Sequence, residues 1–338
     1  MHPEGNDIFR NLAYSADVII ETFAPGYLAL LDLGYDQLET NNQDLIMCSI
    51  TPFGQTGPWK NFVTSDLLHL AAGGQMASCG YDDMDIPDAP PIAPGGGNSW
   101  HTASHYAYMA IMAALLHRNC TGKGQYVDVS VHDSCALTTE NAVPTYIYAG
   151  NVVRRHTGRA ASPDMSEQTQ FPTKDGGWVN VLRAGSSLTP SQLHALAKWM
   201  DSLGLAGDLL EERYQEVNVI ENELEHINKI LANFFANMPE YEAWHGGQKL
   251  GLPWGGIRTM DEILDDEHLR DRGFFVEVEH PEIGRSFTYP GSAAIFSDSP
   301  WRISNRAPLA GEHNEQILAN ELGLTSTKID ELRRMGVI

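Results

Sequence analysis

The chain has 338 residues, 42% of them hydrophobic and 20% charged, which predicts a globular protein large enough for two domains. Lys and Arg number 22 against 44 Asp and Glu, and the resulting net charge of −22 repels nucleic acids and anionic membrane surfaces. The four cysteines form no CxxC pair, so we expect reduced thiols and neither a disulfide framework nor a zinc site. Without an apolar run that could span a bilayer, and without a secretory signal, the expected location is cytoplasmic.

Helix and strand patterns alternate over the first half of the chain. The segment PEGNDIFRNLA predicts a short amphipathic helix, and a buried strand follows around residues 18–21. After another helix-like stretch, DLIMCSIT at residues 44–51 predicts a second strand. A long turn-rich region then precedes an apolar helix over about residues 102–118. Such alternation indicates a parallel α/β sheet.

Residues 123–138, GKGQYVDVSVHDSCAL, change their pattern halfway. Val127, Val129 and Val131 alternate with polar residues, as in a strand with one buried face. The run stops at Asp133, before a helix-compatible segment. On residue type alone, Asp133 fits a helix N-cap better than a nucleophile, because Asp is a favoured capping residue. A helix N-terminus also keeps a carboxylate ionised and ready to attack, so both roles stay open.

The second half becomes polar after residue 150, which predicts a linker over residues 151–170. A strand, DGGWVNVL, and helices such as PSQLHALAKWMDSLG follow, and the acidic run LLEERYQEVNVIENELEH predicts a solvated helix face. FFVEVEHPEIGRSFTYPG indicates two strands joined by a turn, and EQILANELGL and TKIDELRRMGVI indicate two terminal helices.

Three further patterns are weak signals of chemistry. APGGGNSWH at residues 93–101 lacks the lysine of a phosphate-binding loop, which leaves a Gly-rich turn beside a site as the better interpretation. His101 and His105 could share a helix face, but no third ligand is evident and we predict no metal. The basic patch VVRRHTGR at residues 152–159 fits salt bridges at a domain interface better than a site for an anionic substrate.

Five stretches together resemble the family III CoA-transferases, the group of formyl-CoA transferase and the carnitine CoA-transferases, with α-methylacyl-CoA racemase as a relative. They occur in the family's order and span nearly the whole chain. The stretches are ADVIIETFAPGYLALLDLGYDQL, LIMCSITPFGQTGPW, AALLHRNCTGKGQYVDVSVHDS, LPWGGIRTMDEILDDEHLRDRGFF and APLAGEHNEQIL.

The resemblance implies an α/β fold with two domains. A large Rossmann-like, CoA-binding domain would be built from both chain ends, residues 1–150 and 291–338. After the linker at 151–170, a smaller α+β domain would cover residues 171–290. The resemblance also implies an interlocked homodimer, in which two ring-like subunits thread through each other.

The resemblance further implies covalent catalysis, with Asp133 in the place of the family's nucleophilic aspartate. Asp133 would carry CoA as an aspartyl-CoA thioester between an acyl-CoA donor and a carboxylic acid acceptor. Asp66 matches a second acidic residue near the site in formyl-CoA transferase. The Gly-rich turns near 54–57 and 95–97 are the expected sources of backbone amides for the oxyanion. CoA is then the only expected cofactor, without a metal.

Three departures from the family's pattern matter. The chain starts at MHPEG, inside a segment resembling LDxKxPEG, so we expect an N-terminally incomplete CoA-binding domain or a separate chain that supplies the missing part. Ala24 and Leu30 stand where arginines commonly occur, which leaves Thr22, Phe23 and Ala24 as the loop against CoA and Lys60 as a local positive charge. The Gly-rich small-domain loop of formyl-CoA transferase is not found in RRHTGRAASPDMSEQTQ, so formyl and oxalyl substrates are not expected.

Two alternatives stay open beside the CoA-transferase. One is a non-catalytic or partner-dependent family member that lacks part of the CoA site. The other is a 2-methylacyl-CoA racemase or isomerase, which needs two groups that move a proton at the α-carbon. Ser65 replaces the racemase histidine, and Ser99 or its neighbour Asn98 replaces the racemase aspartate, which disfavours that chemistry.

Overall fold

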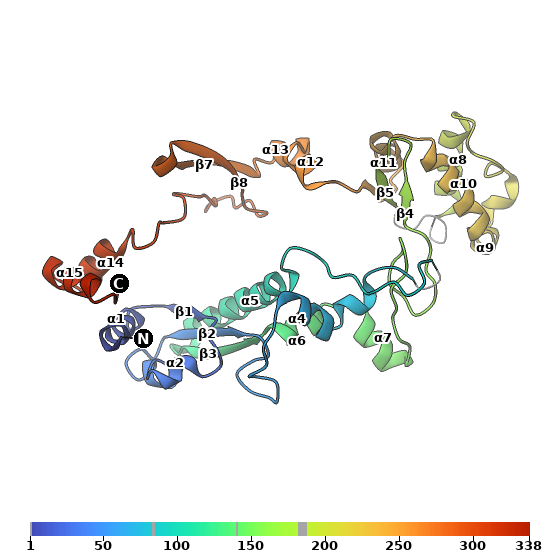
Figure 1. Ribbon diagram of the computed structural model, residues 1–338. Helices are drawn as coiled ribbons and strands as arrows, with labels where there is room; N and C mark the ends of the chain where they lie inside the picture. Colours follow the sequence, from blue (N-terminus) through green and yellow to red (C-terminus); the bar gives the residue numbers. More distant parts are fainter. Residues whose placement is uncertain (1, 83–84, 140, 182–187) are drawn as a thin grey trace. The chain divides into compact units, whose positions relative to one another are not determined.

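The structure is a computed structural model, and it describes residues 2–82, 85–139, 141–181 and 188–338 (Figure 1). By its internal contacts the chain divides into two units, Met1–Ile8 with Arg258–Ile338 and Phe9–Ile257. The domain boundaries expected from the sequence stay a prediction. Within the described ranges, no helix combines the length and the apolar character needed to cross a membrane.

A parallel three-stranded sheet organises the first part of the unit Phe9–Ile257, in the order β1-β2-β3. Helix α1 (Pro3–Ala13) leads into β1 (Val18–Glu21), as predicted. The other two strands are β2 (Ile46–Thr51) and β3 (Gln125–Ser130). Since all three run in the same direction, their carboxyl ends lie at one edge of the sheet. Two short helices, α2 (Tyr27–Leu30) and α3 (Tyr35–Leu38), connect β1 to β2.

The apolar helix of the sequence is α5 (Asn98–Thr121), which extends beyond the predicted 102–118 at both ends. Gly97 and Gly122 flank it with φ angles of 70° and 72°, a left-handed conformation that suits glycine. Its buried Ala107 and Ile111 pack with Cys48 and Val129 of the sheet. Helix α4 (Asp66–Ala72), η1 (Gln75–Ser78) and α6 (Val131–Leu137) complete this part.

The junction between β3 and α6 differs from the sequence prediction. The strand ends at Ser130, and α6 begins at Val131, whose side chain is buried. Ser130 is the N-cap, because its Oγ accepts a hydrogen bond of 3.2 Å from the backbone N–H of Asp133. Asp133 is therefore the third residue of the helix, and the expectation that it caps the helix is wrong.

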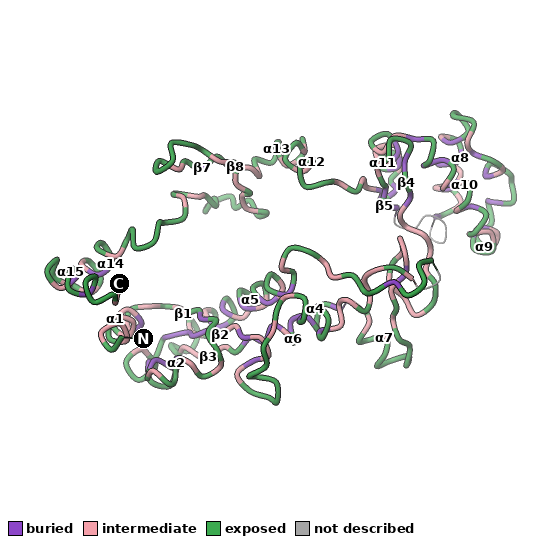
Figure 2. Tube along the Cα trace, in the orientation of Figure 1, coloured by how far each residue is buried: buried purple, intermediate pink, exposed green. Residues whose placement is uncertain are grey.

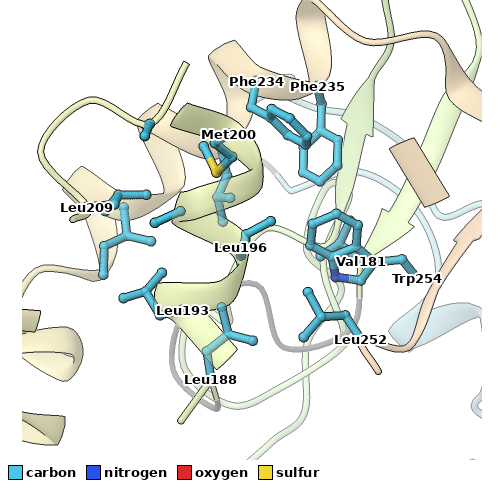
Figure 3. Close-up of a cluster of buried hydrophobic side chains, with 14 of the residues drawn as sticks. Val181, Leu188, Leu193, Leu196, Met200, Leu209, Phe234, Phe235, Leu252 and Trp254 are labelled. Carbon is cyan, nitrogen blue, oxygen red and sulfur yellow. The ribbon is translucent and has the colours of Figure 1, made fainter. Parts of the chain in front are cut away.

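A second, antiparallel sheet follows, in the order β4-β5-β6. Helices pack on it around one apolar core, in which Leu196, Met200, Phe234, Phe235 and Trp254 are buried (Figure 3). The predicted strand DGGWVNVL is β5, and its last residue, Leu182, lies outside the described residues. The elements are β4 (Gln170–Pro172), β5 (Trp178–Val181), α8 (Pro190–Asp201), η2 (Glu212–Gln215), α9 (Val217–Asn222), α10 (Leu224–Ala236), α11 (Glu240–Lys249) and β6 (Trp254–Gly256).

The acidic run is not one solvated helix face, because it is divided among η2, α9 and the start of α10. Tyr214 and Ile220 turn inward and are buried. Arg213 forms ion pairs with Asp208, with Glu211 at 2.8 Å and with Glu223 at 2.9 Å, and so gathers acidic groups from separate turns. Burial raises the pKa of Tyr214 to about 12. The helix is interrupted here because the burial of Tyr214 and Ile220, and not charge alone, determines the path of the backbone.

The basic patch of residues 152–159 connects the predicted linker to Tyr81, Asp82 and Ala89. Nε of Arg155 donates to the carbonyl oxygen of Tyr81 at 2.7 Å, and a second guanidinium nitrogen donates to that of Ala89 at 2.8 Å. Nδ1 of His156 lies 2.9 Å from a carboxylate oxygen of Asp82. These contacts favour the structural interpretation of the patch over an anion site.

The unit of Met1–Ile8 with Arg258–Ile338 contains the strand pair and the terminal helices predicted from the sequence. Arg306 joins its segments, with hydrogen bonds of 2.6 Å to Glu282 and 2.8 Å to Glu312. Hydrogen bonding to Arg306 lowers the pKa of Glu312 to about 2. The elements are α12 (Met260–Leu264), α13 (Glu267–Asp271), β7 (Phe275–His280), η3 (Pro281–Ile283), β8 (Arg285–Pro290), α14 (Asn314–Asn320) and α15 (Ser326–Arg334).

Candidate active site

The candidate residues follow the carboxyl ends of the parallel strands. Thr22, Phe23 and Ala24 come directly after β1, residues 52–60 come after β2, and Asp133 comes after β3. In open parallel sheets, ligands bind in the crevice outside these ends. The topology therefore brings three separate stretches of sequence to one edge.

Asp133 is exposed and opens into a cavity of about 390 Å³. The cavity is formed by the loop after β2 together with β3 and the first turn of α6. The described residues that line it are Phe53, Gly54, Thr56, Gly57, Pro58, Trp59, Asp128, Ser130, His132 and Asp133. Its volume is in the range of small-molecule sites.

Of the two Gly-rich turns predicted to supply oxyanion amides, the one after β2 shares this cavity with Asp133. Gly54 and Gly57 have φ angles of 81° and 89°, so any other residue would be strained there. The turn at 95–97 precedes α5 and is not among the described lining residues. The backbone N–H of Gln55 is already engaged with Asp128, which leaves its neighbours as candidates.

Two hydrogen bonds connect the loops after β1 and β2 to each other and to strand β3. The backbone N–H of Gln55 donates to Oδ2 of Asp128 at 2.9 Å, and Oε1 of Gln55 accepts from the backbone N–H of Gly26 at 3.1 Å. Gln55 also lines a second cavity of about 280 Å³, together with Glu21 of β1, Tyr27 of α2 and residues of α3, β2 and β3. The sequence analysis did not select Asp128 or Gln55, although alternation along β3 marks Asp128 as an outward-facing residue.

The predicted CoA loop is exposed at Thr22, Phe23 and Ala24. The backbone N–H of Phe23 donates to Glu21 at 2.6 Å, and the Phe23 ring lies 5.0 Å from the ring of Tyr27. Leu30, which stands where the family commonly has arginine, is 85% exposed. Lys60 is exposed and lines neither cavity among the described residues.

Asp66 occupies a different position from Asp133. It is the first residue of α4, and its Oδ1 accepts hydrogen bonds from the backbone N–H of Ser99 at 3.0 Å and from Ser99 Oγ at 2.6 Å. Ser65 caps α4, because its Oγ accepts from the N–H of Leu68 at 3.3 Å. Asp66 therefore links the starts of α4 and α5, and it does not line the cavity of Asp133 among the described residues.

An aromatic cluster centred on the half-buried Phe53 forms part of the cavity wall. The Phe53 ring centroid lies 5.1 Å from that of His69, 5.5 Å from His132 and 5.9 Å from Trp59. His69 is fully buried, and neither ring nitrogen has a hydrogen-bond partner among the described residues. Burial, followed by the nearby His132, lowers the pKa of His69. Sequence reasoning missed this cluster, because its members come together only in the fold.

The histidine pair of α5 is the candidate metal site in the sequence. Nδ1 of His105 lies 2.7 Å from the carbonyl oxygen of His101, so this ring bonds to its own helix. Among the described residues, no three His, Cys, Asp or Glu side chains gather as metal ligands would.

Residues 1–314 match the CoA-transferase family III profile. The chain belongs to this family. It is an enzyme that transfers CoA, and CoA thioesters are its substrates.

Several curated members are similar to this CoA-transferase over essentially its whole length. The succinyl-CoA–L-malate CoA-transferase beta subunit of Chloroflexus aurantiacus is 28% identical over 338 residues, which are 100% of this chain and 80% of that protein. The succinyl-CoA:(R)-benzylsuccinate CoA-transferase subunit BbsE of Thauera aromatica is 29% identical, with 100% and 80% covered. The succinyl-CoA:glutarate CoA-transferase of Homo sapiens is 29% identical, with 99% and 73% covered.

A solved structure supports the fold. The crystal structure of a CaiB/BaiF family protein from Brucella suis superposes with a TM-score of 0.76 at 26% identity, covering 94% of this CoA-transferase and 79% of that chain. The expected α/β class with a parallel sheet is thus confirmed.

Proposed function

We propose that this CoA-transferase moves CoA from an acyl-CoA donor to a carboxylic acid acceptor through an aspartyl-CoA thioester on Asp133. One observation carries the proposal. Asp133 is an exposed carboxylate in a cavity that it shares with the Gly54–Gly57 turn, at the carboxyl ends of the parallel strands.

The reaction proceeds by alternate attack of carboxylate and thiolate. Asp133 attacks the donor's thioester carbonyl, the C–S bond breaks, and a mixed anhydride and CoA thiolate form. The thiolate attacks the aspartyl carbonyl and releases the donor acid, which leaves CoA on Asp133. The acceptor carboxylate then attacks this thioester, and the returning thiolate takes the acceptor acyl group and frees Asp133. No proton is consumed, so the site needs no general acid.

Each carbonyl addition places negative charge on an oxygen, and backbone amides of the turn at residues 54–57 are the proposed donors to it. Water must be kept from the anhydride and the thioester, or the enzyme becomes a thioesterase. The rings of Phe53 and Trp59 line the cavity and favour its exclusion.

We assign the CoA nucleotide to the loop after β1. Phe23 offers an exposed ring for stacking, Thr22 and Ala24 flank it, and the second cavity lies beside Tyr27. Lys60 is the proposed partner for a phosphate. Asp66 is proposed to act through Ser99, by fixing the start of α5. The three relatives are named for succinyl-CoA, which makes succinyl-CoA a donor to include in every assay.

The proposed assembly is a homodimer, interlocked as the resemblance implies. Helix α7 (Ala142–Ala149), described in full, is largely apolar and has no buried residue (Figure 2). Ile147 is 69% and Tyr148 89% exposed, a surface that a second copy would cover. Native mass measurement of the purified protein tests this proposal. A second polypeptide in the complex would support the partner-dependent alternative, and two of the relatives are themselves named as subunits.

The geometry gives no support to the racemase alternative. Ser65 is engaged as the cap of α4 and Ser99 Oγ donates to Asp66, and a neutral serine hydroxyl is too weak a base to remove an α-proton. A racemase would exchange the α-proton of 2-methylacyl-CoA with deuterium from solvent, and we expect no such exchange.

Hydroxylamine trapping tests the covalent step. The protein is incubated with a panel of acyl-CoAs and hydroxylamine, digested and analysed by mass spectrometry. We expect a hydroxamate on the peptide that carries Asp133, and none in the variant Asp133→Asn, whose transferase activity should fall to background. An unmodified Asp133 with every donor would overturn the proposal.

A further inference from the structure

The described residues that line the cavity of Asp133 include an aromatic wall and acidic groups but no Lys or Arg. We propose that this cavity selects apolar acyl groups, aromatic ones above all, over acyl groups that carry a second carboxylate. This inference rests on the proposed function, because it concerns the acyl group that is transferred at Asp133.

The aromatic wall is built from side chains that hold one another in place. Trp59 and Phe62 stack, with centroids 6.0 Å apart and planes at 18°. The Phe53 ring meets Trp59 edge-on at 84°, and His132 lies 5.5 Å from both rings. His69 supports Phe53 from the buried side. Because the rings support one another through contacts within the chain, little side-chain ordering is needed when an acyl group enters.

Part of this wall is uncovered. Trp59, which lines the cavity, is 45% exposed, so apolar surface remains there for a ligand to cover. A phenyl group would pack against Trp59 edge-to-face or offset-stacked, as aromatic pairs prefer. With about 390 Å³, the cavity has room for an arylalkyl acyl group.

The charges in the cavity disfavour a second carboxylate. The titratable side chains among its described lining residues are Asp128, His132 and Asp133, and none is a Lys or Arg. A succinyl group would bring another negative charge close to two carboxylates in a confined space, without a cation to meet it. An uncharged acyl group avoids this repulsion.

Donor competition tests the inference. With one common acceptor, kcat/KM is measured for 3-phenylpropanoyl-CoA, butanoyl-CoA and succinyl-CoA. The last two have the same carbon chain and differ in the terminal carboxylate. We expect 3-phenylpropanoyl-CoA to exceed succinyl-CoA by about tenfold or more, with butanoyl-CoA between them. A kcat/KM for succinyl-CoA equal to or above the other two would overturn the inference.

Variants test the two causes separately. Trp59→Leu should lower kcat/KM for 3-phenylpropanoyl-CoA about tenfold and change that for butanoyl-CoA little. Trp178→Leu is the matched control, because Trp178 is 46% exposed on β5 and does not line the cavity. Thr56→Lys places a cation in the cavity and should raise kcat/KM for succinyl-CoA relative to butanoyl-CoA.

The trapping experiment separates the two possible failures. If no acyl-CoA modifies Asp133, the proposed function fails and this inference fails with it. If every acyl-CoA modifies Asp133 and succinyl-CoA reacts fastest, the covalent function stands and only the inferred selectivity is wrong.

Discussion

The two sheets of the unit Phe9–Ile257 differ in how completely the helices near them in the sequence are buried. Around the antiparallel sheet, Phe234, Phe235 and Trp254 are fully or almost fully buried in one cluster. After the parallel sheet, α7 has no buried residue, and all of its residues are described. A segment that buries its own apolar side chains is stabilised within one chain, whereas exposed apolar helices indicate a surface that something else covers. The contrast separates residues that matter for folding from residues that we propose to matter for assembly.

Removing a ring from the buried cluster should give the largest effect. Phe235 contacts Phe171, Phe234 and Trp254, and Phe235→Ala would leave a cavity among them. We expect the free energy of unfolding to fall by roughly 3–5 kcal/mol in urea denaturation. The exposed Val217 of the same region provides the control Val217→Ala, which should stay within about 0.5 kcal/mol of the parent. Equal effects of the two changes would contradict the assignment of this core.

Placing a charge on α7 should weaken association but not folding. Ile147→Lys is expected to raise the dimer dissociation constant at least about tenfold, or about 1.4 kcal/mol, in sedimentation over a range of concentrations. At protein concentrations below the dissociation constant, the urea midpoint of the variant should equal that of the parent. The control Asn218→Lys places the same charge at an exposed position near the compact core. A dissociation constant unaffected by Ile147→Lys would show that α7 is not at the interface.

Acid should destabilise the part of the chain that contains the parallel sheet, through the buried His69 of α4. His69 is the buried titratable residue behind Phe53, and its pKa is lowered in the folded state. Below about pH 6.5 the unfolded chain therefore binds more protons at this site, and the free energy of unfolding falls as pH falls. In His69→Phe the decline between pH 7.5 and 5.5 should be shallower than in the parent. If the free energy of unfolding fell equally with pH in the parent and in His69→Phe, His69 would not be buried in its neutral form.

The smallest effect on stability is expected from the loops. Gln55→Ala removes the hydrogen bond to the backbone N–H of Gly26, a net loss of about 1 kcal/mol or less. We expect KM for acyl-CoA to rise while the urea midpoint hardly moves. Gln43→Ala is a suitable control, because Gln43 is exposed and lines neither cavity. Unchanged KM values in Gln55→Ala would separate this loop from CoA binding.

Local patterns in the sequence predicted much of the fold. The alternating valines predict β3, and the apolar content predicts α5, which begins after Gly97 and ends before Gly122. The exact start of α6 was missed, because Ser130 and Asp133 are both good caps and only backbone geometry decides between them. The acidic run was misjudged because Arg213 binds carboxylates that are distant along the sequence.

The candidate site was predicted less completely than the fold. The motif around Asp133 identified the carboxylate, and the topology brings the turn of residues 54–57 to it. The partnership of Asp66 with Ser99 joins residues 33 positions apart, and no local pattern indicates such a pair. The contact between Phe53 and His69 likewise could not be predicted from the sequence, because the two residues come together only in the fold.

The link from Gly26 through Gln55 to Asp128 joins the loops after β1 and β2 to strand β3 with only two hydrogen bonds. A ligand that orders the loop after β1 therefore also restricts the loop after β2, before anything binds to that second loop. Conformational entropy of the loops is then lost when the nucleotide portion of acyl-CoA binds, and it need not be lost again when the acyl portion binds. Thermodynamically, we expect the two halves of one substrate to behave as cooperative ligands of each other.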